Sequence, residues 1–379
     1  MSNDQELPSK RLASLDGLRG VAAVVVLVHH ATASIPQLGN VYFGEIAPQG
    51  LTWLVNSPLH LVWAGTEAVL VFFILSGVVL TLPSLRRGYD WWSYFPSRLL
   101  RLYMPVIASV ALAVLIVLLV PRTGVAGRGE WMESHSMSPS LRQLFLDVTL
   151  LKPGWLNGPL WSLRWEVIFS ILLPLYLLVA ARLRKRSVLI ISASVLISWA
   201  GTVLESSALT YLPIFFLGCA LAPHLRDDSR KWNPRIWPWA FGAALIGITL
   251  PWTLRPILAS SDKLVYPVVL VSAMIIVVAS VRWAPVRRGL ESRTIQYLGT
   301  MSFSLYLVHD PIIVAVATTL PGNAPWLAAC VSLPLTLGTA AVFHKLVEAP
   351  SHTQAKRLAR FIRQRRSSPR IEASRRRQQ

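Results

Sequence analysis

The sequence predicts an all-α, polytopic integral membrane protein with about ten transmembrane helices. Of its 379 residues, 53% are hydrophobic and only 15% are charged, and the mean hydropathy is +0.50. Soluble domains usually carry about a quarter charged residues, so this composition favours a bilayer as the solvent. Apolar runs also recur along the chain near the length of roughly 20 residues that a helix needs to cross the hydrocarbon core.

Ten apolar runs are candidates for these helices, and the run at 208–223 is the weakest. The ten lie at residues 17–34, 65–83, 102–121, 159–181, 187–204, 208–223, 237–254, 264–282, 298–320 and 325–347. The loops are too short for a second domain, so we expect one membrane domain over 1–350. The tail, 351–379, is basic and poor in apolar residues, and we expect it to be disordered and attracted to anionic lipid headgroups.

The distribution of basic residues predicts the orientation of the spans. With ten spans, thirty Lys and Arg residues fall on the side of the N-terminal tail and six on the other side. Because loops rich in Lys and Arg stay in the cytoplasm, both termini should be cytoplasmic, with the chain in the inner (plasma) membrane. The net charge of +19 is then mostly an orientation signal, and no soluble domain offers a basic face for nucleic acid.

The first segment has one competing interpretation, a cleavable signal peptide. A basic pair at 10–11, an apolar stretch at 21–28 and a small-residue triplet at 31–33 imitate its three regions. The central region of a signal peptide is apolar, however, whereas this segment is entered through Asp16 and Arg19. We therefore expect a retained first helix.

Ionisable side chains inside the spans are the strongest functional signal, because burying them in hydrocarbon is costly and they usually mark sites. Those that cannot easily reach the headgroups are Asp16, Arg19, His29, His30, Glu67, Arg164, Glu166, His309 and Asp310.

Two of these side chains share a face of the first span. His30 follows Arg19 by eleven residues, which is about three helical turns and roughly 16 Å along the axis. His29 points about 80° away from that face. An imidazole titrates near neutrality and can accept a hydroxyl proton, so His30 is a candidate general base. A histidine that only packs against a neighbouring helix is the alternative.

Polar residues also gather at the end of the second span and in the loop after it. Ser76-Gly77 forms a small-residue spot where either another helix or an acyl chain can approach closely. Arg98 and Arg101 follow in the cytoplasmic loop at spacing i, i+3. If that loop is helical, both guanidinium groups lie on one face and suit a phosphate-rich ligand. Anchoring by the positive-inside rule is the alternative.

The fourth span carries Trp161, Ser162 and Glu166 near its outer end. Glu166 is a candidate to receive or orient a hydroxyl. An ion pair with Arg164 is the alternative, although residues at i and i+2 do not face each other on a helix.

The ninth span places Tyr306 and His309 before Pro311, where we expect a kink. His309 lies about 11 residues from the cytoplasmic entrance, so it should reach a depth similar to that of His30. A metal site on these two histidines has no third ligand at a motif spacing. Cys219 and Cys330 both lie in apolar runs and indicate neither a disulfide framework nor a metal site. We expect no bound metal or cofactor.

Taken together, these segments resemble the acyltransferase-3 family, the membrane-bound O-acyltransferases of the surface-polysaccharide acetylation type. The resemblance covers nearly the whole chain, from about Arg11 to Pro350. It rests on LDGLRGVAAVVVLVHH (15–30), FFILSG (72–77), the pair Arg98 and Arg101 followed by Pro105, LWSLRWEVIFSILLP (160–174), LGTMSFSLYLVH (298–309) and VEAP (347–350).

The resemblance implies an enzyme that takes an acyl group, by default acetyl, from cytoplasmic acyl-CoA as cosubstrate. The acceptor would be a hydroxyl of a glycan, a lipid-linked sugar or a glycosylated metabolite. The family's essential histidine falls on His30, its donor-binding arginines on Arg19, Arg98 and Arg101, and its Trp-Ser-Leu-x-x-Glu element on residues 161–166.

This chain departs from the family pattern by placing Arg164 and Trp165 inside that last element. Some members carry an additional extracytoplasmic domain, and we expect this chain to act alone or with a separate partner of that kind. Further site candidates are Asp16, Ser76, Trp161, Ser162, Tyr306 and His309.

Two questions stay open at the level of sequence. His30 can act as a general base for direct attack on the thioester, or it can form an acyl-histidine intermediate. The competing class of function is a transporter or flippase of a lipid-linked sugar or acyl donor, which also needs intramembrane ionisable residues. Inverted repeats, a common sign of transporters, are not visible in this sequence.

Overall fold

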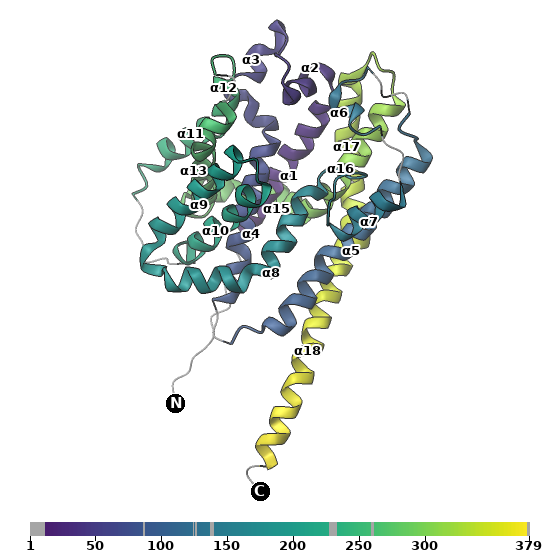
Figure 1. Ribbon diagram of the computed structural model, residues 1–379. Coiled ribbons are helices and arrows are strands. Elements are labelled where there is room, and N and C mark those ends of the chain that lie inside the picture. Colours follow the sequence, from purple (N-terminus) through teal and green to yellow (C-terminus); the bar gives the residue numbers. More distant parts are fainter. Residues whose placement is uncertain are drawn as a thin grey trace.

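A computed structural model describes residues 12–85, 88–123, 125, 127–136, 140–226, 233–258 and 261–376. Within these residues the chain is a bundle of helices, and α18 leaves the bundle at the end where α1 begins (Figure 1). We call this the basic end. The opposite end, which carries the short helices α2, α3 and α6, is called the loop end.

Ten apolar helices of the described residues coincide with the ten predicted runs. They are α1 (Ala13–Ala33), α4 (Gly65–Ser84), α5 (Trp91–Leu119), α8 (Leu160–Arg182), α9 (Ser187–Val203), α10 (Ser207–Arg226), α11 (Trp237–Ile248), α13 (Ser261–Arg282), α16 (Ser302–Thr319) and α17 (Pro325–Phe343). Eight are long and apolar enough to cross a membrane, while α9 and α11 are shorter. The predicted class, an all-α polytopic membrane protein, is confirmed.

Short helices connect these spans. At the loop end are α2 (Pro36–Gly39), η1 (Asn40–Phe43), η2 (Gln49–Leu51), α3 (Thr52–Val55), η3 (Pro58–Trp63), α6 (Glu130–Glu133) and α12 (Leu250–Leu254). Helix α7 (Leu141–Thr149) lies lower, on the side of the bundle against α5. At the basic end are η4 (Arg184–Arg186), α14 (Ala284–Leu290) and α15 (Arg293–Thr300). The loop-end segments matter for function, because two of them pack over the polar interior described below.

Three predicted boundaries differ from the structure. The run expected at 298–320 is broken at Met301, between α15 and α16, and the run expected at 237–254 is broken at Thr249, between α11 and α12. Helix α5 starts at Trp91, with Asp90 as its N-cap accepting a hydrogen bond from the Trp92 amide, and not at residue 102. The loop that carries Arg98 and Arg101 is therefore helical, as their proposed shared face requires.

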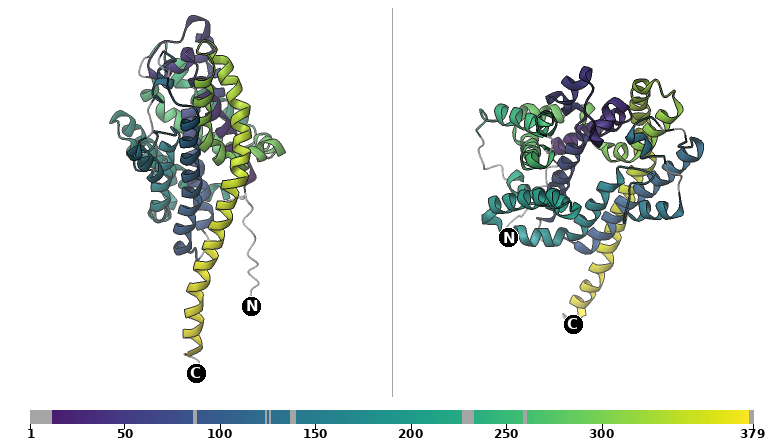
Figure 2. Two further views of the ribbon diagram at one scale, coloured as in Figure 1. Left: turned by 90° about the vertical axis from the view of Figure 1, so that its right-hand side faces the viewer. Right: turned by 45° about the horizontal axis from the view of Figure 1, so that its top comes forward.

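The basic tail differs most from its prediction. Helix α17 passes through a π-helical turn, His344–Glu348, into α18 (Ala349–Arg376), so the described tail is helical where we expected disorder. Its first part packs along α5, and its remainder projects away from the bundle (Figure 2). Arg363 and Arg366 lie 3.5 and 3.4 Å from the Asp90 carboxylate, and such exposed pairs contribute little stability.

Helix α1 lies in the middle of the bundle, and glycines let it approach α15. A Cβ on Gly20 would collide with the backbone of Gly299, and a Cβ on Gly299 would collide with the carbonyl of Asp16. Asp16 therefore lies at this helix contact and not among the residues that line the pocket described below. Gly77 plays the same role on α4, against the carbonyl of Phe215 in α10.

We predict that Gly20→Ala and Gly299→Ala each lower the thermal stability of the detergent-purified protein. The added methyl group has no room, and overpacking typically costs about 1–3 kcal/mol. Gly338→Ala is the matched control, since open space surrounds that glycine and Ala is the better helix former by about 1 kcal/mol. Equal melting temperatures for all three variants would show that α1 and α15 can separate freely.

Candidate active site

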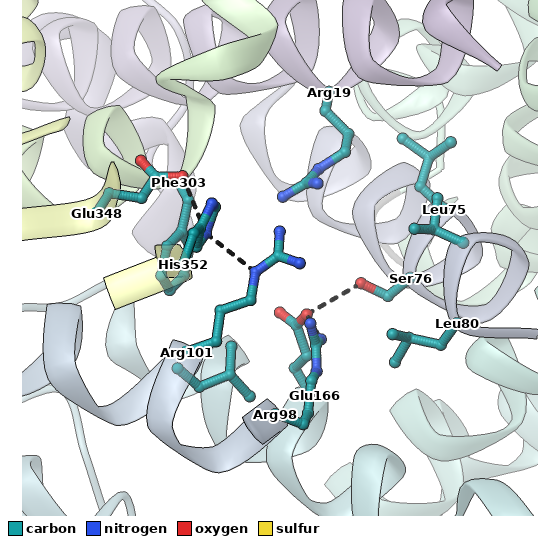
Figure 3. Close-up of a pocket in the computed structure, with 12 residues that line it drawn as sticks. Arg19, Leu75, Ser76, Leu80, Arg98, Arg101, Glu166, Phe303, Glu348 and His352 are labelled. Carbon is teal, nitrogen blue, oxygen red and sulfur yellow. Dashed lines mark hydrogen bonds and ion pairs between the residues drawn. The ribbon is translucent and has the colours of Figure 1, made fainter. Parts of the chain in front are cut away.

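A polar pocket opens within the half of the bundle toward the basic end. It encloses about 60 Å³, and side chains from helices far apart in sequence point into it (Figure 3). It is lined by Arg19, Leu75, Ser76, Val79, Leu80, Arg98, Arg101, Leu102, Glu166, Phe303, Glu348 and His352. We call it the arginine pocket, because three guanidinium groups meet there.

Arg98 is bound to α8 through two of its three guanidinium nitrogens. Its Nη2 forms an ion pair with Glu166 Oε1, and its Nε donates to Ser170 Oγ at 3.3 Å. Ser76 Oγ donates to the same carboxylate oxygen of Glu166 at 3.3 Å. As the helical spacing indicates, Arg164 is not the partner of Glu166, and its guanidinium lies over the Trp165 ring instead. The Glu166 carboxylate thus belongs to the arginine pocket.

Arg101 and Arg19 are less engaged than Arg98. Arg101 Nε donates to His352 Nε2 at 3.0 Å, and Glu348 lies behind His352, with Oε1 3.8 Å from that nitrogen. Arg19 extends toward Arg101 (Figure 3). In the described part of the chain it makes no hydrogen bond or ion pair. Glu166 and Glu348 both line the pocket, so its three guanidinium groups outnumber its two carboxylates, and the remaining positive charge suits an anion.

A second polar group lies toward the loop end, where His30 and His309 meet. His309 Nε2 lies 3.1 Å from His30 Nδ1, so the expectation that both rings reach one depth is correct. His309 Nδ1 lies 3.1 Å from the Leu305 carbonyl, and His30 Nδ1 also lies 3.0 Å from the Val26 carbonyl. We call these two side chains the histidine pair.

The tautomers of the pair follow from these contacts. The Leu305 carbonyl can only accept, so His309 carries its proton on Nδ1, and its Nε2 accepts from His30 Nδ1–H when both rings are neutral. His30 Nε2 then holds a lone pair, and within the described residues no hydrogen bond occupies it. This nitrogen is the one available to a hydroxyl proton.

His29 faces a different environment from His30. Its Nδ1 lies 3.1 Å from the Trp63 carbonyl, and its ring packs against Tyr42 and beside Gly65, where a Cβ would collide with the imidazole. The hydrogen-bond partners of the two neighbouring histidines therefore diverge as predicted, while their rings pack edge to face with centroids 4.9 Å apart.

Loop-end residues that the sequence interpretation missed cover the histidine pair. The Trp131 ring lies 6.0 Å from the His30 ring. His135 Nε2 lies 3.2 Å from Asp310 Oδ1, and the buried Asp310 carboxylate also accepts from the Gly158 amide at 3.0 Å. His135 lies in a loop without periodicity or motif, and only the intramembrane position of Asp310 indicated that a partner should exist.

Two hydroxyl groups lie beside the pair. Ser162 Oγ and Tyr306 Oη are 2.7 Å apart, and Tyr306 Oη donates to the Pro159 carbonyl at 3.2 Å. The Tyr306 ring is 5.7 Å from the His309 ring. Trp161, in contrast, packs against aromatic rings of Phe73 and Tyr211. Tyr306 thus packs against the histidine pair and Ser162 is linked to the pair through Tyr306, whereas Trp161 forms part of the hydrophobic packing.

Glu67 belongs to a separate buried network. Its carboxylate accepts from Trp252 Nε1 at 3.0 Å, and the indole stacks on His60 with ring centroids 4.0 Å apart. Burial lowers the pKa of His60 to about 3, so this imidazole is neutral. Its Nδ1 hydrogen bonds to the Val55 carbonyl, and Tyr42 Oη lies 3.1 Å from Nε2. We attribute a packing role to this network.

Comparison with known proteins decides the class of the molecule. A family model described as an acyltransferase domain, Acyl_transf_3, matches residues 12–345. The chain belongs to the acyltransferase-3 family. It is accordingly an acyl-transferring enzyme of the membrane.

Two curated relatives of this acyltransferase have informative names. The O-acetyltransferase PaAT-1 of Phomopsis amygdali is 25% identical over 362 residues, which cover 79% of this chain and 71% of the relative. The acyltransferase MdmB of Streptomyces mycarofaciens is 25% identical over 328 residues, which cover 80% of this chain and 79% of the relative. No solved structure matches.

The arginine pocket of the acyltransferase yields a test of its central ion pair. Arg98→Ala and Glu166→Ala should each lower thermal stability, because each leaves a charge unpaired among half-buried side chains. The double variant should lose less than the sum of the two, with a coupling of about 0.5–3 kcal/mol. The control is the exposed pair of Lys263 and Glu205, whose coupling should be near zero. Additive losses at Arg98 and Glu166 would contradict the ion pair.

Proposed function

We propose that this acyltransferase transfers an acyl group, acetyl by default, from acyl-CoA to a hydroxyl of a glycan, a lipid-linked sugar or a glycosylated metabolite. The basic end faces the cytoplasm in the inner (plasma) membrane, and the loop end faces the acceptor. The observation that carries this proposal is the excess of guanidinium groups in the arginine pocket, which matches the phosphates of CoA. The name of one relative, O-acetyltransferase PaAT-1, supports acetyl and an oxygen acceptor.

The donor lies along α1 in this proposal. Arg19 in the arginine pocket and His30 in the histidine pair share one face of α1 and are eleven residues apart, or roughly 16 Å. The nucleotide phosphates bind at the guanidinium groups, and the flexible pantetheine arm carries the thioester toward His30. Apolar side chains that line the pocket, such as Leu75 and Phe303, accommodate the arm.

The transfer uses the open nitrogen of His30. His30 Nε2 takes the proton of the acceptor hydroxyl while the oxygen attacks the thioester carbonyl, so that a C–O bond forms. Collapse of the tetrahedral intermediate breaks the C–S bond, and the proton passes to the departing sulfur. The products are an ester and free CoA. In the two-step variant, His30 Nε2 attacks the thioester carbonyl and expels the CoA thiolate, and the acceptor hydroxyl then displaces the imidazole while its proton passes to that thiolate.

His30→Ala should abolish acetyl transfer in the purified protein, measured as CoA release from acetyl-CoA with and without candidate glycans. A general base usually contributes about 10² to 10⁴ in rate, and binding of CoA should stay near normal. His29→Ala is the matched control, because it removes an imidazole from the same helical turn, and that imidazole faces Trp63 and Tyr42.

Two outcomes would contradict this assignment. Activity that survives His30→Ala but is lost in His29→Ala would move the base to the other face of α1. A wild-type protein that moves acyl donor or lipid-linked sugar across vesicles without releasing CoA would be a transporter.

Cysteine labelling tests the proposed orientation. In a Cys330→Ser background, the exposed loop-end position Ser136→Cys should react with an impermeant maleimide on intact cells. The exposed basic-end position Ser292→Cys should react only after permeabilisation. Labelling of Ser292→Cys on intact cells would reverse the orientation and the side from which acyl-CoA enters.

A further inference from the structure

We propose that His352 is a positioning residue of the donor site, which holds Arg101 so that both terminal nitrogens of its guanidinium group face the nucleotide phosphates. This inference rests on the proposed acyl-CoA donor. It assigns a donor-site role to α18, the helix beyond the family match at 12–345. It also separates the roles of Arg98 and Arg101, which the sequence interpretation treated as an equivalent pair.

Arg98 and Arg101 differ in which nitrogens of the guanidinium group remain free. Arg98 uses Nη2 for Glu166 and Nε for Ser170, so binding a phosphate there means competing with an ion pair. Arg101 uses only Nε, for His352, among the contacts that the described residues provide. Its Nη1 and Nη2 are the parallel donors that bind phosphate oxygens in a bidentate manner. Arg101 is therefore the phosphate ligand, and Arg98 neutralises Glu166.

The contact between Arg101 and His352 requires a specific form of the imidazole. Arg101 Nε–H is a donor, so His352 Nε2 must offer a lone pair, and the ring is neutral with its proton on Nδ1. Without this partner, the Arg101 side chain rotates freely about its terminal bonds, and Nη1 and Nη2 are no longer held toward the phosphates. His352 thus lowers the conformational freedom that Arg101 would lose on binding the donor.

Hydrogen bonds to the Glu348 carboxylate, together with the π-helical turn, hold His352 at the pocket. Glu348 is buried and accepts from the Ser304 amide at 3.1 Å, from Ser304 Oγ at 2.6 Å and from His344 Nδ1 at 3.0 Å. These bonds fasten the start of α18 to the start of α16. The π-helical turn, a feature often found at functional sites, brings Glu348 and His352 into the lining of one pocket.

The test compares His352→Leu with His352→Gln for two donors. With acetyl-CoA, His352→Leu should raise KM about 10- to 100-fold, the range for losing a hydrogen bond to a charged group, with kcat within about twofold. His352→Gln should restore most of the affinity, because its amide oxygen can accept from Arg101 Nε. With S-acetyl-pantetheine, which lacks the nucleotide phosphates, His352→Leu and wild type should have equal KM values.

Gln354→Leu is the matched control, since Gln354 follows His352 by two residues on α18 but is exposed and does not line the pocket. It should keep a normal KM for acetyl-CoA. The inference is overturned if His352→Leu keeps a normal KM, if Leu and Gln behave alike, or if the loss is equal for both donors. If the wild-type protein does not release CoA from acetyl-CoA, the proposed function itself is wrong.

Discussion

Arg98 and Glu166 face each other inside the membrane domain, where an unpaired charge is costly. Their ion pair joins α5 to α8 and leaves two further guanidinium groups in the arginine pocket, that of Arg19 and that of Arg101, which bonds to His352 only through Nε. Without Glu166, three guanidinium groups would repel one another in a small volume, with only the Glu348 carboxylate to offset them. With Glu166 present, the net charge of the pocket is still positive and attracts phosphates, and the ion pair holds α5 against α8.

Helix α1 connects this pocket to the chemistry at the other end. Its glycines allow close contact with α15, which fixes the depth of the helix in the bundle. One face then carries Arg19 at the arginine pocket and His30 at the histidine pair. The preceding side chain, His29, bonds instead to the Trp63 carbonyl. The spacing of three helical turns matches a long, flexible donor whose charged and reactive ends are far apart.

Local sequence patterns could predict the spans, the shared face of Arg19 and His30, and the common depth of His30 and His309, because helical periodicity determines them. They could not predict the partners of Glu166 and Arg101, which are 68 and 251 residues away. Trp131 lies in the four-residue helix α6 and His135 in the turn after it, and a segment this short has no periodicity to indicate its place. The helical tail was missed because α18 packs along α5, and composition alone carries no information on that contact.

Whether one donor molecule spans the arginine pocket and the histidine pair is tested most directly by alkylation with bromoacetyl-CoA. The Cys330→Ser protein is treated with the reagent, digested, and mapped by mass spectrometry. The proposed donor path predicts an adduct on the His30 imidazole that excess CoA prevents. An unmodified His30 with adducts confined to the arginine pocket, such as on His352, would show that the thioester stays at the basic end and would contradict this path.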